Sequence, residues 1–131
     1  MGMETDKGYF DLQVNGYMGV DFNGDGLSAA QLHQACSDMR SHGVDGFLAT
    51  ITTDSPDKMA GRLAKIAAMR ASDTLVARTL VGFHIEGPFI NETPGYRGCH
   101  PVAAIEPASP DKMNRLLDAA AGLTRMVTLA P

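Results

Sequence analysis

Apolar and polar residues alternate along several short stretches of the chain, and this two-residue period predicts β-strands. Residues 9–15 alternate in this way and stop at Gly16, whereas residues 44–52 are apolar and β-branched enough to form a second strand. Residues 125–130 have the same character at the end of the chain. Four glycines together with Asp and Asn predict a loop over residues 16–26.

The apolar run over residues 75–85 predicts a further strand, buried and parallel, that is established by about Leu80. It leads directly into Glu86, which Gly87 and Pro88 follow, so the acid should lie at the carboxyl end of the strand. In α/β folds that end of the sheet carries ligands and metals. The alternative is a purely structural role, in which the Glu86 carboxylate only accepts hydrogen bonds from the loop after it.

Helical spacing of apolar residues separates these strands. Ser28 with Gln31 makes a capping box for a first helix that runs to about Ser41. The sequence Ser-Pro-Asp-Lys-Met occurs at residues 55–59 and again at residues 109–113, and each copy predicts a helix start with a serine cap and a first-turn proline. Residues 87–107 form a long loop, and loops of that length in a compact domain are usually functional.

The alternation of strand and helix predicts an α/β fold of parallel (β/α) units, with the four strands in sequence order and the helices packed outside them. Four such strands make about half of a TIM-type barrel, which normally has about 250 residues, whereas this chain has 131. We therefore expect residues 1–131 to be one partial (β/α) barrel domain that looks incomplete. Its free strand edges should be buried against another segment or another copy, so we expect a homo-oligomer.

Composition limits the partners and the cellular compartment that we expect for the protein. The formal net charge of −4 argues against a nucleic-acid partner, and the apolar stretches are too short to span a bilayer. The sequence does not open with a signal peptide. Cys36 and Cys99 make no disulfide framework, so we expect a cytoplasmic protein with ordinary thiols.

Several polar residues are placed where they can line a site. His84 and Glu86 should point to the same side of their strand, toward the lumen of a barrel, although spacing does not decide which of them would hold a metal. Gln13 and Asn15 share a face at the end of the first strand. His100 in the long loop is a candidate substrate contact, with surface exposure as the alternative.

Two other patterns suggest a metal but lack ligands. Residues 21–26 match the opening of a calcium loop, yet Leu32 stands at the twelfth position, which must supply a bidentate carboxylate. His33 and Cys36 lie one helical turn apart, but two ligands on an exposed helix make no site. We expect the side chains of His33 and Cys36 to be solvated.

Taken together, these stretches resemble the N-acetylglucosamine-6-phosphate deacetylases of the amidohydrolase superfamily. The matching segments occur in family order and cover nearly the whole chain: residues 11–16 with 19–23, then 46–50, 84–89, 98–101 and 127–131. Many superfamily members carry a His-x-His pair at the end of strand one, whereas Gln13 and Asn15 stand at those places here, as is usual in the deacetylase branch. The resemblance therefore argues against a two-metal centre of the usual kind.

The resemblance implies roles for several residues. Glu86 would be a ligand of a divalent metal ion, either zinc or iron or manganese, while Cys99 and His100 match the loop that contacts the amino-sugar phosphate. Family members hydrolyse the acetamide of N-acetylglucosamine 6-phosphate to glucosamine 6-phosphate and acetate, with a water that the metal activates. The resemblance thus implies a metal-dependent hydrolase of amino-sugar metabolism.

The chain departs from the family in what it lacks. Two histidine metal ligands and the aspartate that acts as general acid and base follow strand four in the family, so they are expected beyond Pro131. We therefore expect the N-terminal part of such a deacetylase barrel, inactive as this chain alone. The rival hypothesis is a non-enzymatic half-barrel that binds a sugar phosphate or self-associates.

Overall fold

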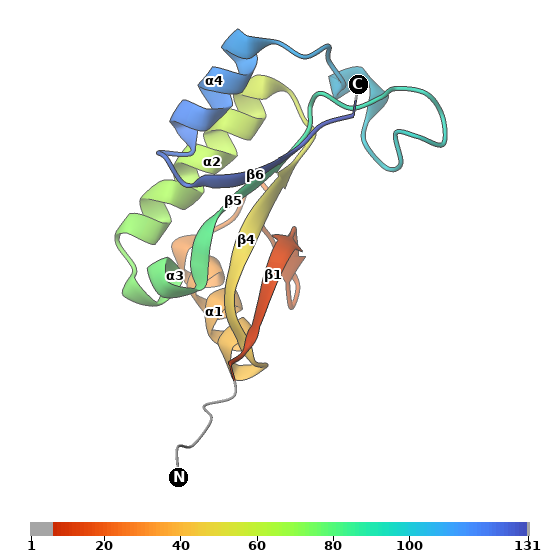
Figure 1. Cartoon of the computed structure of the whole chain (residues 1–131). Coiled ribbons are helices and arrows are strands. Elements are labelled where there is room, and N and C mark those ends of the chain that lie inside the picture. Colours follow the sequence, from red (N-terminus) through yellow and green to blue (C-terminus); the bar gives the residue numbers. More distant parts are fainter. Residues whose placement is uncertain (1–6, 131) are drawn as a thin grey trace.

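The computed structural model describes residues 7–130, which form a twisted sheet with helices along one side (Figure 1). The elements in chain order are β1 (Tyr9–Val14), β2 (Gly16–Tyr17), β3 (Val20–Asp21), α1 (Ala29–Ser41), β4 (Val44–Thr52), α2 (Pro56–Ala71), α3 (Thr74–Thr79), β5 (Leu80–Glu86), the 3-10 turn η1 (Val102–Ala104), α4 (Pro110–Ala119) and β6 (Thr124–Thr128). Strands β1, β4, β5 and β6 form the main sheet, and β2 pairs with β3 in a separate ribbon.

The main sheet has the order β1-β4-β5-β6, and all of its strand pairs are parallel. This confirms the predicted order of four successive strands and the α/β class of parallel (β/α) units, half the strand number of a TIM-type barrel. The register places Thr52 opposite Glu86 and Glu86 opposite Thr128. The carboxyl ends of β4, β5 and β6 therefore meet at one edge.

The hydrophobic core lies between the sheet and its helices. Phe47 and Ile51 of β4 and Phe83 of β5 are fully buried there. The helices contribute the apolar residues that their spacing predicts, namely Leu32, Ala35, Cys36 and Met39 of α1 and Met59, Leu63, Ile66 and Ala67 of α2. Within residues 7–130, no helix combines the length and the apolar character that crossing a membrane requires.

Side-chain caps confirm the predicted helix starts. Ser28 accepts from the N–H of Gln31, and the Gln31 side chain accepts from the N–H of Ser28, which is the expected capping box. Ser55 and Ser109 each accept from the N–H three residues later. The repeated Ser-Pro-Asp-Lys-Met sequence therefore begins a helix twice.

The start of the strand at about Leu80 is confirmed, but the first half of the apolar run over residues 75–85 is not strand, because residues 74–79 form the short helix α3. The Asp73 carboxylate accepts from the N–H groups of Leu75 and Val76 and caps this helix. The Val76 N–H, followed by the hydrogen bond from His33, lowers the pKa of Asp73 below its ordinary value. The cap outweighs the weak strand preference of the run, and β5 begins at Leu80.

A tight hairpin of β2 and β3 occupies part of the stretch that was predicted to be a loop. Gly16 pairs with Asp21, and Tyr17 pairs with Val20. A Cβ at Gly16 would lie 2.3 Å from the Val20 carbonyl oxygen, so the close approach of the two strands requires glycine. The Tyr17 hydroxyl lies 2.7 Å from Nδ1 of His42, which fixes the hairpin against the end of α1.

Cys36 is buried in the core, as its place in the apolar spacing of α1 predicts, so the expectation of a solvated thiol is wrong at this position. His33 points elsewhere and pairs with Asp73 at 2.7 Å, so the two residues share no site. Burial, with a smaller contribution from the charge of Asp73, raises the pKa of the Cys36 thiol from 9.0 to about 12.

The raised pKa predicts a thiol that is unreactive in the folded protein. With a thiol reagent at about pH 8, we expect exposed Cys99 to be labelled and Cys36 to be labelled only on unfolding. Because the folded-state pKa lies above the unfolded value, the free energy of unfolding should fall as the pH rises from 9.0 toward about 12. Equal native labelling rates at the two cysteines would contradict this position for Cys36.

Candidate functional site

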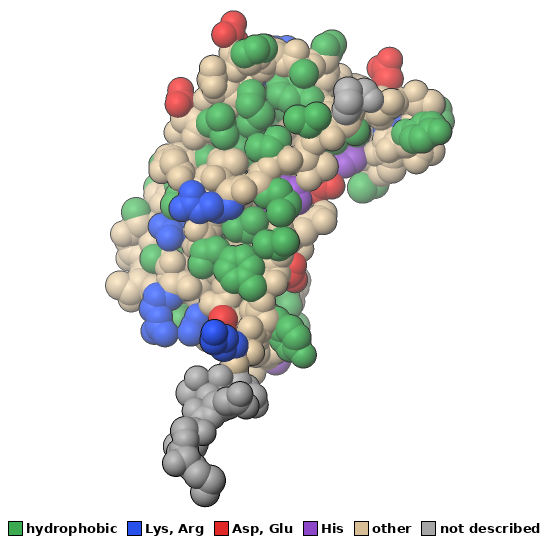
Figure 2. All heavy atoms as spheres, viewed as in Figure 1, with side chains coloured by type: hydrophobic (Ala, Val, Ile, Leu, Met, Phe, Trp, Pro, Cys, Tyr) green, Lys and Arg blue, Asp and Glu red, His purple; other side chains and the backbone are tan. Residues whose placement is uncertain are grey.

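Glu86 is the last residue of β5 and lies at the edge where the strands of the main sheet end. Its side chain faces away from the helices, because Phe83 and Ile85, which alternate with it, belong to the helix-side core. Figure 2 shows acidic and histidine side chains gathered in the hollow between the long loop and the sheet. The Glu86 side chain itself is 18% exposed, so it is largely but not fully removed from water.

Two side chains approach the Glu86 carboxylate, one at each oxygen. Gln13 of β1 donates from Nε2 to Oε2 at 3.0 Å. His100 of the long loop places Nε2 at 3.4 Å from Oε1. A carboxylate that is largely removed from water needs such donors, and the structure thus brings together three of the residues that the sequence analysis named.

His100 is held from its other side by Thr53. The Thr53 hydroxyl lies 2.6 Å from His100 Nδ1 and 3.3 Å from the main-chain oxygen of Glu86. The His100 side chain is only 13% exposed, so the alternative of a surface histidine is wrong. Thr53 was not predicted as a site residue, and the one available signal is its position directly after β4, where parallel strands carry ligand-binding residues.

His84 lies on the same face as Glu86, as predicted, but both of its ring nitrogens are engaged within the sheet. Nδ1 lies 3.1 Å from the Leu12 carbonyl oxygen of β1, and Nε2 lies 2.7 Å from the Thr128 hydroxyl of β6. A carbonyl oxygen can only accept, so Nδ1 carries the proton that it donates. His84 therefore ties the two outer strands to the centre of the sheet, below Glu86.

The two side chains that approach the Glu86 carboxylate, Gln13 and His100, do not include Asn15 or Cys99. Asn15 follows β1, accepts a main-chain hydrogen bond from Phe22 and lines a shallow surface hollow together with the β2–β3 hairpin. Cys99 is exposed beside His100 in the loop. A substrate contact by Cys99 and a site-lining role for Asn15 therefore remain predictions.

Two polar links position the loops around Thr53. The Asn23 side chain donates to the Thr50 carbonyl and accepts from the Thr52 N–H, both at 2.9 Å, so it fastens the loop after β3 to β4. Asp54 accepts from Arg62 at 2.9 Å. Burial raises the pKa of Asp54, but hydrogen bonds from the Ser55 N–H and Arg62 outweigh it and lower the pKa below its ordinary value.

These residues fit one part of a metal site. Glu86 offers one partly exposed carboxylate as a ligand, and the His100 ring lies beside it. Catalytic zinc sites typically use three protein ligands and leave a position for water. In the part of the chain that the structure describes, no three His, Cys, Asp or Glu side chains are grouped so that they can hold a metal ion. Further ligands would have to come from other residues.

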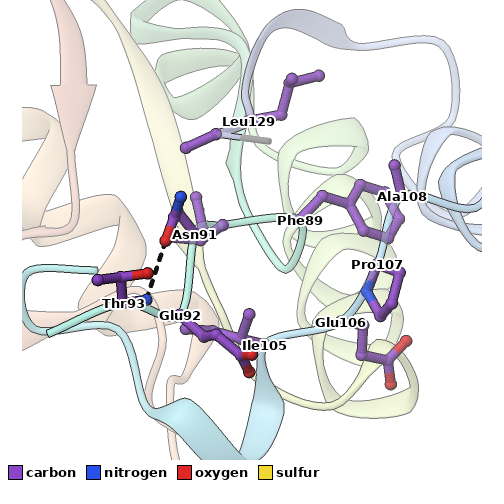
Figure 3. A pocket seen from close by; sticks show the side chains of 11 residues that line it. Phe89, Asn91, Glu92, Thr93, Ile105, Glu106, Pro107, Ala108 and Leu129 are labelled. Carbon is purple, nitrogen blue, oxygen red and sulfur yellow. Dashed lines mark hydrogen bonds between the residues drawn. The ribbon is translucent and has the colours of Figure 1, made fainter. Parts of the chain in front are cut away.

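A larger pocket lies between the two ends of the long loop and the residues after β6 (Figure 3). Its volume is about 440 Å³, and its lining is mainly apolar. The main contributors are Phe89, Ile90, Ile105, Pro107 and Leu129. The sequence analysis gave no sign of this pocket, because its walls come from segments that only the fold brings together.

No family model matches the chain. Among curated proteins it is 31% identical to the N-acetylglucosamine-6-phosphate deacetylase of Caenorhabditis elegans (99% of this chain, 32% of that protein) and 33% identical to that of Homo sapiens (95% and 30%). The N-acetylgalactosamine-6-phosphate deacetylase of Shewanella sp. (strain ANA-3) is 32% identical (95% and 30%). The chain thus spans 30–32% of the length of these curated relatives.

Solved structures point to the same enzymes. N-acetyl-D-glucosamine-6-phosphate deacetylase from Mycobacterium smegmatis, a variant in complex with N-acetyl-D-glucosamine-6-phosphate, matches with a TM-score of 0.79 at 28% identity, over 95% of this chain and 30% of that one. The enzyme from Pasteurella multocida matches with a TM-score of 0.76 at 26% identity, over 94% and 31%. The likeness therefore extends to sequence as well as fold.

The packing of Thr53 against Gly87 predicts that alanine cannot replace this glycine. Gly87 has φ of +95°, and a Cβ there would lie 1.9 Å from the Thr53 hydroxyl oxygen. We expect Gly87→Ala to lower the free energy of unfolding by about 2 kcal/mol or more, measured by urea denaturation. The matched control is Gly61→Ala inside α2, where a Cβ meets nothing and alanine should be neutral or stabilising. Equal denaturation midpoints for Gly87→Ala and the unaltered chain would contradict the prediction.

Proposed function

Since nearly the whole of this chain is homologous to a segment of the N-acetylglucosamine-6-phosphate deacetylases, we propose that it builds one side of a site that hydrolyses an acetamide. In this reaction the oxygen of water bonds to the carbonyl carbon and the carbon–nitrogen bond breaks. The nitrogen takes a proton and leaves as the amine, and acetate is released. The proposed substrate class is an N-acetylated hexosamine 6-phosphate, of either the gluco or the galacto configuration that the relatives' names specify.

The observation that carries the proposal is the placement of Glu86. A carboxylate at the carboxyl end of a parallel strand lies where α/β enzymes hold ligands and metals. Its two oxygens are approached by an amide from β1 and by an imidazole from the long loop, so three distant segments converge on it. A carboxylate whose role was only to accept hydrogen bonds from the adjoining loop would not need a partner from β1.

Each residue of the cluster has a proposed task. When bound, a divalent zinc, iron or manganese ion would polarise the acetamide carbonyl and activate water, and Glu86 would be one of its ligands. Gln13 orients the Glu86 carboxylate through its hydrogen bond to Oε2. His100 presents a ring nitrogen beside the same carboxylate, where it can contact a polar group of the sugar phosphate. The remaining metal ligands and the general acid and base are proposed to come from residues other than these.

A direct assay tests the chain by itself. We expect no acetate release from N-acetylglucosamine 6-phosphate or N-acetylgalactosamine 6-phosphate with added zinc, manganese or iron(II), because one carboxylate and one neighbouring imidazole are too few ligands for a catalytic metal. Robust turnover that is lost in Glu86→Gln would contradict this expectation. It would mean that residues of this chain supply the missing ligands, with His84 and His100 the first to substitute.

A segment exchange tests the role of Glu86 in catalysis. The Bacillus subtilis N-acetylglucosamine-6-phosphate deacetylase matches this chain at 29% identity over 126 residues, so this chain can replace the corresponding segment there. Loss of a group that only orients a metal ligand costs about 10- to 100-fold in activity, so we expect Glu86→Gln in the chimera to cost more than about 10²-fold. Glu92→Gln, an exposed acid of the same loop region, is the matched control and should leave acetate release unchanged. An active chimera that tolerates Glu86→Gln would contradict the proposed role.

We also propose that another polypeptide, in the simplest case a second copy, covers the open side of the sheet. Strands β1 and β6 each pair on one edge only within the main sheet. Tyr9, Phe10 and Leu12 of β1 remain 80%, 53% and 51% exposed, which is unusual for apolar residues of neighbouring positions. These features favour the self-associating half-barrel as the second candidate function.

Sedimentation velocity tests this second proposal. We expect the unaltered chain to sediment as an oligomer at micromolar concentration and Leu12→Lys to shift it toward the monomer, because a charge on an open edge opposes pairing. Tyr96→Lys, at a more exposed apolar residue of the long loop, should not change the sedimentation. A folded monomer of the unaltered chain at all concentrations would rule the proposal out.

A further inference from the structure

Thr53 has a position that its sequence context does not explain. It directly follows β4, it is 5% exposed, and its hydroxyl reaches both the main chain of Glu86 and the ring of His100. We infer that Thr53 is a positioning residue whose hydroxyl holds the His100 ring against the Glu86 carboxylate. The value of this placement for substrate contact depends on the proposed function, but the placement itself can be tested without it.

The donors and acceptors around His100 assign the direction of each hydrogen bond. The Glu86 carboxylate can only accept a proton, so a neutral His100 is best placed with its proton on Nε2, the ring nitrogen that lies 3.4 Å from Oε1. Nδ1 is then an acceptor, and the Thr53 hydroxyl 2.6 Å away is its donor. The contact of the same hydroxyl with the Glu86 carbonyl, at 3.3 Å, is longer and therefore the weaker competitor for that proton. The Glu86 carboxylate thus favours the Nε2–H tautomer, and the Thr53 hydroxyl is the donor that matches it at Nδ1.

The surroundings hold the Thr53 side chain in place. The Gly87 backbone leaves no room for a Cβ because Thr53 packs against it. The long loop is anchored at its ends, since the Glu106 N–H donates to the Pro88 carbonyl at 3.0 Å. His100 lies in the middle of that loop and contacts the strand ends through Thr53 and Glu86. Removal of the hydroxyl should therefore release the middle of the loop while leaving its ends attached.

The tautomer of His100 is the first test, and it needs no variant of Thr53. Long-range proton–nitrogen NMR spectra at about pH 8.5, where an unperturbed imidazole is neutral, report which nitrogen carries the proton. The chain has four histidines, so His100→Gln identifies the signal by its loss. We expect the Nε2–H form to dominate at His100. Dominance of the Nδ1–H form would overturn the inference.

The second test compares two substitutions of Thr53. Thr53→Val keeps the shape but removes the hydroxyl, and we expect hydrogen exchange of the His100 amide, which donates to Arg97, to accelerate about five-fold. Thr53→Ser retains the hydroxyl and should restore protection to within about two-fold. The control Thr79→Val removes another buried threonine hydroxyl, from the end of α3, and should leave the His100 amide unchanged.

The outcomes separate this inference from the proposed function. The positioning role would be overturned if hydrogen exchange of the His100 amide were unchanged in Thr53→Val. It would also be overturned if exchange in Thr53→Ser were as fast as in Thr53→Val. Neither result depends on the activity of the chimera. If Thr53→Val does not fold, the tautomer of the unaltered chain and the exchange of Thr53→Ser still decide. Conversely, an inactive chimera would count against the proposed function and leave the NMR result for Thr53 untouched.

Discussion

The arrangement of side chains at the carboxyl edge of the sheet depends on which groups contact the oxygens of the Glu86 carboxylate. A charged group that is largely removed from water must be given donors, because its desolvation is costly. Here β1 supplies Gln13 and the long loop supplies His100. The requirement therefore couples the first strand and a loop far along the chain to the end of β5. It also explains why the middle of the long loop, without regular structure except for η1, folds back onto the sheet.

A second set of polar contacts lies within the sheet. His84 bridges the Leu12 carbonyl of β1 and the Thr128 hydroxyl of β6, although β4 lies between β1 and its own strand. Thr50 adds a further link, since its hydroxyl accepts from the Val14 N–H. Polar groups on the face opposite the helices are thus satisfied across the strands rather than by the loops. This is the way in which an α/β sheet keeps buried polar side chains hydrogen-bonded.

The sheet is asymmetric in what covers it. One face packs against helices, while the other carries the Glu86 cluster and ends in strands with unpaired edges. The open face is compatible with cover by residues of a longer chain, since the relatives are about three times as long, and equally with cover by another polypeptide. Either cover would place additional residues near Glu86, and a catalytic metal would need further ligands there.

The sequence by itself determined the fold class, the strand order and the helix starts, because these follow from local periodicity and from serine caps next to their own helices. It also singled out Glu86, since an acid directly after an apolar run is visible without any structure. The long loop offered His100 as a further candidate, and the family resemblance added Cys99. The helix at residues 74–79 was hidden, because the Asp73 cap competes with an apolar run that has strand character.

Only the tertiary structure decided which polar residues meet. It brought Thr53 to His100 and Gln13 to Glu86, and it joined His84 to Leu12 and Thr128 of the two outer strands. None of these pairings is local, and those of Gln13 and His84 depend on strand register, because a shift of one residue would turn the side chain to the opposite face. Spacing along the chain lists the candidates for a site, whereas the register of the sheet selects among them.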